Sequence, residues 1–186
     1  MRRGLVVVVL AAAALFLGTR YAGVRKDLEA ERKNINSAWA GVDAALTDRA
    51  GLIPDLVDTI RKEAPAETGA MQAASDARQG LERAQGPREK LQANGRLDHA
   101  LSLLLLCTEN YPKLQDSKPL SDLEDSLKDS EDRIAVERRK YNEAVEHYNA
   151  RIEVFPDNLV ASLAGLGKID VYFDTPGVPG SAKGAL

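Results

Sequence analysis

The sequence has few of the residues on which disulfide-bonded and metal-binding proteins depend. Its 186 residues include one cysteine, one tryptophan and two histidines. A lone cysteine excludes an intrachain disulfide, and Cys107, which follows four leucines, is expected to be a small core residue. Neither His99 nor His147 has Cys, His or carboxylate companions at the spacing of metal ligands, so we expect no metal site.

Recognised catalytic motifs are also missing. The string Gly165-Leu-Gly-Lys-Ile169 resembles part of a phosphate-binding loop, but Ser162 stands at the first glycine position, and isoleucine follows the lysine where Ser or Thr is needed. There is no Gly-x-Ser-x-Gly, His-Glu-x-x-His or EF-hand pattern, nor the paired Glu-x-x-His elements of a di-metal bundle. We therefore expect neither an enzyme nor a cofactor.

Charge is divided unevenly along the chain. Residues 1–33 hold seven Lys and Arg against three Asp and Glu, whereas residues 34–186 hold eighteen against twenty-five. Because phosphate contacts need clustered Lys and Arg, the acidic body argues against nucleic-acid binding. The basic segment instead lies beside the longest apolar run, where anionic lipid headgroups would attract it.

The apolar run Leu5–Leu17 has no polar side-chain atom over thirteen residues. It would span about 20 Å as a helix and fit a cleaved signal peptide, whereas residues 4–24 would span about 31 Å, enough to cross the hydrocarbon core. Signal peptides are cut at small residues that follow the apolar run, but the small residues Ala11–Ala14 lie inside it. Cleavage after Ala22 would put Arg20 at the third position before the cut, where a small residue is needed. We therefore predict a retained single-pass anchor at residues 1–24, touching membrane lipid through residues 4–24. A cleaved signal is the alternative.

The side of the membrane on which the rest of the chain lies stays open. Five Lys and Arg follow the run within about sixteen residues, and two arginines precede it. Counted in this way, the positive-inside rule favours a cytoplasmic module, whereas a short run led by arginines favours the opposite orientation. Of the two, we favour the cytoplasmic side.

The low aromatic content, 5%, and the frequent alanine and leucine favour helix over sheet. From Tyr21 to Ile60, apolar residues recur at spacings of three, four or seven, which is the pattern of one helix face. Pro54 removes a backbone hydrogen bond, yet the apolar residues on both sides of it stay in phase. The sequence therefore predicts one helix, continuous with the anchor and kinked at Pro54.

Three further helices are predicted between Pro and Gly breaks. One has the alanine-rich stripe 70–84, one has the stripe 97–111 after an ambiguous stretch at 87–95, and the longest has the stripe 120–152. Asp116, Ser117 or Ser121 is expected to cap the longest helix, and Asp157 or Asn158 a short helix at 159–166. Residues 174–186 are expected to be disordered. Four amphipathic helices with short connections favour an all-α fold with one shared core, over residues 25–173.

Arg49 falls on the apolar stripe between Leu46 and Ile53. A guanidinium at such a position must be paired with a carboxylate or must reach solvent. A salt bridge that fixes helix register is one interpretation, with Glu124, Glu131 and Glu137 as candidate partners. The alternatives are an arginine that faces a ligand in a crevice of the bundle and one that faces solvent.

Aromatic positions mark the expected core. Trp39 lies on the first apolar stripe, where packing is its expected role. The pairs Tyr141-Asn142 and Tyr148-Asn149 lie seven residues apart, which places both rings in the core and both amides at its edge. Amides at that edge can cross-link neighbouring helices.

Three blocks of sequence stand out together. They run from Asn34 through Trp39, Asp43 and Arg49 to Pro54-Asp-Leu-Val57, over Glu109-Asn-Tyr111-Pro112-Lys-Leu114, and from Glu131 through Arg138, Tyr141-Asn142 and Tyr148-Asn149 to Phe155-Pro156. In this order they resemble the bacterial LemA family over about residues 24–173. The resemblance implies a single-pass protein of the bacterial inner membrane with an elongated antiparallel four-helix bundle and no established enzymatic activity.

We single out fifteen residues of these blocks as structural or interaction positions: Asn34, Trp39, Asp43, Arg49, Pro54, Tyr111, Pro112, Glu131, Arg138, Tyr141, Asn142, Tyr148, Asn149, Phe155 and Pro156. The favoured function is a membrane-tethered interaction or scaffold module that binds an unknown protein partner or a second copy of itself. The alternative is a ligand- or peptide-binding bundle with a crevice near Arg49 and Pro54. An enzyme would need a carboxylate pair that the sequence does not indicate.

Overall fold

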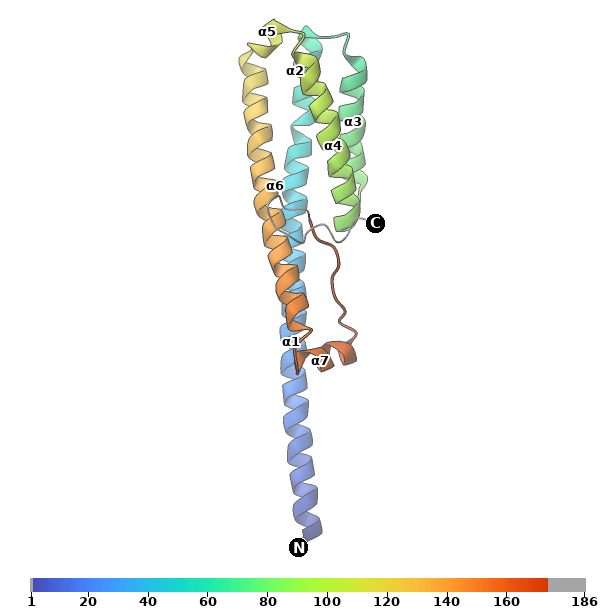
Figure 1. The fold of residues 1–186 in the computed structure, drawn as a ribbon, viewed down its shortest axis with the longest axis vertical. Coiled ribbons are helices and arrows are strands. Elements are labelled where there is room, and N and C mark those ends of the chain that lie inside the picture. Colours follow the sequence, from blue (N-terminus) through green and yellow to red (C-terminus); the bar gives the residue numbers. More distant parts are fainter. Residues whose placement is uncertain (1, 174–186) are drawn as a thin grey trace. The chain divides into compact units, whose positions relative to one another are not determined.

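The computed structural model describes residues 2–173; the side chains of residues 2–11, 13, 14 and 17 also lie outside the described part. The predicted disordered tail, residues 174–186, is thus outside the described residues. Seven helices make up the regular structure of the described part (Figure 1), and that part has no strand: α1 Arg2–Gly51, α2 Ile53–Glu63, α3 Thr68–Arg83, α4 Gly86–Thr108, α5 Pro112–Gln115, α6 Lys118–Arg151 and α7 Asp157–Ala164. The all-α prediction is confirmed.

Two compact units divide the chain. The first combines residues 1–37 with residues 142–170, and the second combines residues 38–141 with residues 171–186. The boundaries predicted after residues 24 and 173 stay predictions. Among the residues whose side chains are described, no helix is both long enough and apolar enough to cross a membrane.

The interruption predicted at Pro54 lies at Leu52, two residues earlier. Leu52 alone separates α1 from α2, and its backbone angles, φ −79° and ψ −18°, are still helical. Its N–H donates to the carbonyl of Arg49 at 3.1 Å, and its own carbonyl accepts from Leu56 N–H at 3.1 Å. Pro54 lies in the first turn of α2, where a missing N–H is tolerated. The chain therefore continues from α1 into α2 with helical backbone angles, as expected for one helix that is kinked near Pro54.

In the second unit, α3 packs against α2 and α4, and α5 contacts both α2 and α4. α2 ends at Glu63, next to the predicted Ala64-Pro65 break. The stretch 87–95, which the sequence left open between loop and helix, is helical and contributes the buried residues Lys90, Ala93 and Asn94 to α4. Pro87 occupies the first turn of α4, so it starts this helix rather than breaking it.

Three helices have other bounds than predicted, and one of them is α7, which spans Asp157–Ala164 instead of 159–166. α4 ends at Thr108, before Tyr111, and α6 ends at Arg151, before Phe155. The hydroxyl of Ser117 accepts a hydrogen bond from Leu120 N–H at 3.4 Å, so Ser117 is the cap among the three candidates for α6. The caps predicted for α7 are wrong: the helix begins at Asp157, so Asp157 and Asn158 lie within it, and Pro156, at the N-cap position, has no side chain that could cap it. The carboxylate of Asp157 is bound to Arg151 instead.

The core of each unit follows the predicted apolar stripes. Leu28, Ile35, Val145, Tyr148 and Ile152 are buried in the first unit, as are Val42, Leu46, Leu56, Ile60, Leu97, Leu104, Leu120 and Ile134 in the second. Cys107 is half-buried rather than in the core. Its burial and the nearby Glu67 carboxylate raise the pKa of its thiol, which therefore stays neutral near pH 7.

Candidate functional site

Arg49 is the centre of a polar network in the second unit. Only 5% of the residue is exposed. Its Nη1 donates to Asp98 Oδ1 at 2.5 Å on α4, and its Nη2 donates to Glu131 Oε1 at 2.8 Å on α6. The predicted buried salt bridge and the predicted partner Glu131 are both confirmed. Three helices therefore meet at one guanidinium, which fixes their register.

The structure corrects the other predicted partners of Arg49. Glu124 is exposed, and the carboxylate of Glu137 pairs with Lys140 at 2.8 Å. Asp98 was missed, although it follows the buried Leu97 on α4 and so lies at the edge of the apolar stripe. Asn94, one turn earlier, donates to the second oxygen of Asp98 at 2.9 Å and holds that carboxylate toward Arg49.

A second ion pair joins α1 to α4. Lys90 Nζ lies 2.9 Å from Oδ1 of Asp43, a family-motif residue, and the lysine is 9% exposed. The sequence did not predict this pair, because Lys90 falls in the stretch that could have been loop. Its placement gives Asp43 a structural partner within the chain.

The ring of Phe173 packs against three motif side chains, which we call the aromatic socket: Trp39, Arg138 and Tyr141. The Trp39 and Phe173 rings stack, with centroids 5.9 Å apart and planes 5° apart. Tyr141 meets the edge of Phe173 at 5.2 Å and 75°, and the guanidinium of Arg138 lies 5.6 Å from the centroid of Phe173. All four residues belong to the second unit. Motif residues from α1 and α6 thus bind a segment that lies after α7 in the chain.

The phenol of Tyr141 is buried in this socket. Burial disfavours the phenolate and raises the pKa of Tyr141 above its ordinary value of 10.0. Tyr141 is buried as predicted, whereas Trp39 has the predicted packing role but is half-buried rather than in the core. The part played by Phe173 was not predicted. The sequence feature that could have pointed to Phe173 is the isolated aromatic pair Tyr172-Phe173, just before the Pro- and Gly-rich residues 174–186.

Tyr148 and Asn149 clamp the segment after α7 in the first unit. The amide of Asn149 pairs with the backbone of Ile169: its Oδ1 accepts from the N–H at 2.9 Å and its Nδ2 donates to the carbonyl at 2.7 Å. The hydroxyl of Tyr148 donates to the carbonyl of Gly167 at 3.1 Å. The prediction that Asn149 forms a cross-link is confirmed, but its partner is an extended segment rather than a helix.

Arg151, which the sequence analysis missed, connects three carboxylates in the first unit. Its Nη1 lies 2.6 Å from Glu31, its Nη2 lies 3.4 Å from Asp27, and its Nε lies 2.6 Å from Asp157. The hydrogen bond to Glu31, followed by that to Asp157, raises the pKa of Arg151. The available signal was the pair Asp27 and Glu31, one helical turn apart on α1.

Tyr111 closes one end of the second unit. Its hydroxyl donates to Glu67 Oε1, just before α3, at 3.0 Å. This hydrogen bond, with burial, raises the pKa of Tyr111. Pro112 begins α5 directly afterwards. The motif residues of the second block therefore join the α2–α3 connection to the α4–α5 connection.

The structure does not bring the fifteen predicted positions together into one site. Asn34, Pro54, Pro112, Phe155 and Pro156 are exposed, and Asn142 is half-buried. The others form the separate contacts described above.

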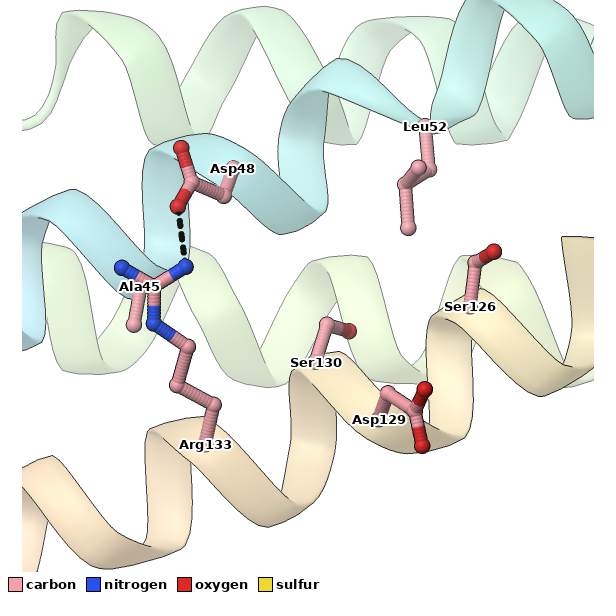
Figure 2. A pocket seen from close by; sticks show the side chains of 7 residues that line it. All are labelled: Ala45, Asp48, Leu52, Ser126, Asp129, Ser130 and Arg133. Carbon is pink, nitrogen blue, oxygen red and sulfur yellow. Dashed lines mark hydrogen bonds and ion pairs between the residues drawn. The ribbon is translucent and has the colours of Figure 1, made fainter.

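The crevice predicted near Arg49 and Pro54 is not lined by either residue. A shallow cleft of about 290 Å³ lies one helix face away, between α1 and α6 (Figure 2), and its walls are Ala45, Asp48, Leu52, Ser126, Asp129, Ser130 and Arg133. Asp48 and Arg133 pair across it at 2.5 Å. Because both Nη atoms of Arg49 are bound to carboxylates, the interpretation of Arg49 as a ligand-facing arginine is wrong.

Known proteins resemble about half of the chain. It is 33% identical over 91 residues to Magnetosome protein MamQ 2 of Paramagnetospirillum magneticum, a match that covers 49% of this chain and 34% of that protein. It is 31% identical over 86 residues to Magnetosome protein MamQ of Magnetospirillum gryphiswaldense, covering 46% and 32%. The matches thus span about a third of the length of these relatives. Residues 38–179 match the family model of the LemA family, so the chain belongs to that family.

Proposed function

We propose that the chain is a membrane-anchored, non-catalytic interaction or scaffold module. One observation supports this most strongly. Motif side chains that could do chemistry, above all Arg49, Asp43, Tyr111 and Asn149, are bound to other parts of the same chain. Such residues stabilise a fixed arrangement of helices whose outer faces are available to a partner.

The membrane anchor is the first part of this proposal. Residues 4–24 carry one charged side chain, Arg20, near their end, and α1 is already helical at Arg2. Two side chains described within this stretch, Leu15 and Phe16, are 72% and 65% exposed, although both are large and apolar. In a bilayer, lipid tails would surround both side chains and remove their apolar surface from water. The relatives named as magnetosome proteins also favour an association with a membrane.

A four-helix bundle is the second part. We assign its four rods to α1 continued by α2, α3, α4 and α6, because α3 packs against α2 and α4 and the Arg49 network ties α1 to α4 and α6. Residues so placed share one apolar core, and their outward faces supply the surface for a protein partner or a second copy of the chain.

Proximity labelling from a ligase fused after residue 186 tests the proposal in cells. We expect repeated labelling of a small set of membrane proteins or of the chain itself, and the side of the membrane on which labelling occurs fixes the orientation. Affinity purification from solubilised membranes should then recover the same set. Recovery of neither a partner nor a self-oligomer in repeated purifications would count against an interaction module.

The cleft between α1 and α6 favours a second candidate, a site for a ligand or peptide. Ser126 lines the cleft, whereas Ser121, on the same helix, is exposed outside it. A Ser126→Trp variant fills the cleft, and Ser121→Trp is the matched control. If the partner binds in the cleft, affinity purification of Ser126→Trp should no longer recover the partner, whereas purification of Ser121→Trp should. Equal recovery with both variants would remove this candidate.

A further inference from the structure

The outer face of α7 is apolar and uncovered in the first unit. Leu159 and Leu163 lie four residues apart on α7 and are 56% and 76% exposed, and Phe155, in the turn before α7, is 74% exposed. The neighbouring Val154 is 63% exposed. Exposed apolar side chains are common singly, but four within ten residues, on α7 and the turn before it, mark a surface that binds something.

Charge is nearly absent from the same segment. From Val154 to Gly167 there is one ionisable side chain, Asp157, and its carboxylate is bound to Nε of Arg151 at 2.6 Å. The face therefore presents no free charge to an apolar environment. Burying it would not require the removal of water from an unpaired ion.

Ion pairs attach the start of α7 to α1 and so fix the position of α7 along the axis of α1. Asp157, its first residue, is joined through Arg151 to Asp27 and Glu31 of α1, at 3.4 and 2.6 Å. Asp27 lies three residues and Glu31 seven residues beyond Val24, the end of the proposed span, which corresponds to roughly 5–10 Å of helix. That distance matches the headgroup layer, about 5–8 Å thick on each side of the hydrocarbon core.

The direction of α7 agrees with this position. Figure 1 shows α7 lying crosswise to α1, to which it is joined within the first unit. If α1 crosses the bilayer, a crosswise helix at the level of the headgroups runs along the membrane surface. At the same level of α1, Lys26 is exposed and suits anionic headgroups, and the exposed Arg25 is paired with Glu29 at 2.8 Å.

We propose that the apolar surface formed by Leu159 and Leu163 of α7 and by Phe155 of the turn before it is a lipid-binding surface that lies in the membrane interface beside the anchor. The inference rests on the proposed anchor at residues 4–24. Interfacial helices bury an apolar face about 5–10 Å into the boundary between headgroups and acyl chains, as this face would. The Arg151 ion pairs would then hold α7 at that depth and fix how the first unit meets the membrane.

Depth-dependent fluorescence quenching tests the proposal on the full chain in phospholipid vesicles that contain anionic lipid. Cys107→Ser removes the native thiol, and single cysteines at Leu163, Phe16 or Val136 carry an environment-sensitive fluorophore. Leu163 is the test position, Phe16 reports the anchor, and Val136, an exposed apolar residue of α6 in the second unit, is the control. Nitroxide attached near the top of the lipid acyl chains quenches from the membrane, and iodide quenches from water.

The expected result is strong lipid quenching at Leu163, a loss of about half the signal or more, with a shift of its emission to shorter wavelength. Lipid quenching at Phe16 but not at Leu163 would overturn the inference and leave the anchor standing. Lipid quenching at neither position would overturn both. Shielding of Leu163 from iodide without lipid quenching, lost on dilution of the protein in the vesicles, would show that a second copy covers the face and would also overturn the inference.

Discussion

Arg49 shows at the scale of one residue how a polar group inside an apolar stripe specifies a fold. A guanidinium in contact with water costs little free energy. Arg49 is only 5% exposed, so its buried charge needs both carboxylate partners. Asp98 and Glu131 keep 46% and 59% of their side-chain surface exposed. Water therefore still reaches the carboxylates, and the main value of the network is that it permits one register of α1, α4 and α6.

Replacement of the arginine should be clearly but not fatally destabilising. We expect Arg49→Ala to lower the free energy of unfolding by about 2–3 kcal/mol, since two charge-assisted hydrogen bonds are lost while both carboxylates can reach water. Arg133→Ala is the matched control, because Arg133 also joins α6 to α1 through Asp48 but is 56% exposed, and it should cost less than about 1 kcal/mol. Urea unfolding in detergent, followed by circular dichroism, measures both. Equal midpoints for the two variants would contradict the buried network.

Tyr141 predicts a dependence of stability on alkaline pH. Its pKa is raised in the folded chain because burial disfavours the phenolate. The unfolded chain therefore loses this proton first, and the contribution of Tyr141, complete below about pH 10, is lost as pH rises toward its folded pKa. Tyr141→Phe keeps the ring against Phe173, so stability at pH 7 should change by about 1 kcal/mol or less.

Thermal unfolding measured between pH 7 and pH 11 checks this. The loss of stability above pH 10 should be smaller in Tyr141→Phe than in the unchanged chain. Parallel pH profiles for the two proteins would mean that the Tyr141 phenol is not protected by burial.

At the scale of elements, the segment after α7 is fixed by side chains of α6 rather than by secondary structure. Asn149 supplies a donor and an acceptor to the backbone of Ile169, in the way that a neighbouring strand would. We expect Asn149→Asp to release residues 165–170, because a carboxylate cannot donate to the Ile169 carbonyl and would repel it. Loss of the paired hydrogen bonds should cost about 1–2 kcal/mol.

Hydrogen exchange followed by mass spectrometry measures this release. Amides in residues 165–170 should exchange faster in Asn149→Asp, while α3 and α4 stay unchanged. The exposed Asn36 provides the control, and Asn36→Asp should exchange as the unchanged chain does. Unaltered exchange at Ile169 in Asn149→Asp would show that the amide clamp does not hold this segment.

Helices and their apolar faces could be predicted from the sequence because spacing alone encodes them. The stripes 21–60, 97–111 and 120–152 supply most of the buried side chains, and Glu131 was found because it lies on α6 opposite the stripe of Arg49. Lys90 was missed because Pro87 obscured where α4 begins. Asp98 was missed because the spacing within one helix does not tell which side chain of another helix it faces. Phe173 was missed because its partners Trp39 and Tyr141 are distant in sequence, and no periodicity connects an extended segment to a helix face.

At the scale of the whole molecule, the two units have different chemistry. The second unit has the Arg49 network and the aromatic socket, whereas the first has the apolar start of α1, the Arg151 ion pairs and the uncovered face of α7. The first unit is thus suited to contact with lipid, and the second presents helix faces on which a protein partner can bind.

Membrane extraction of the full chain tests the central claim most directly. Cells that express the chain with a tag after residue 186 are lysed, and the membranes are washed with alkaline carbonate and with urea before the protein is identified by its intact mass. We expect the chain to stay in the membrane pellet with residues 1–24 still attached. Release into the wash, or recovery of a dissolved product that lacks those residues, would contradict a membrane-anchored module.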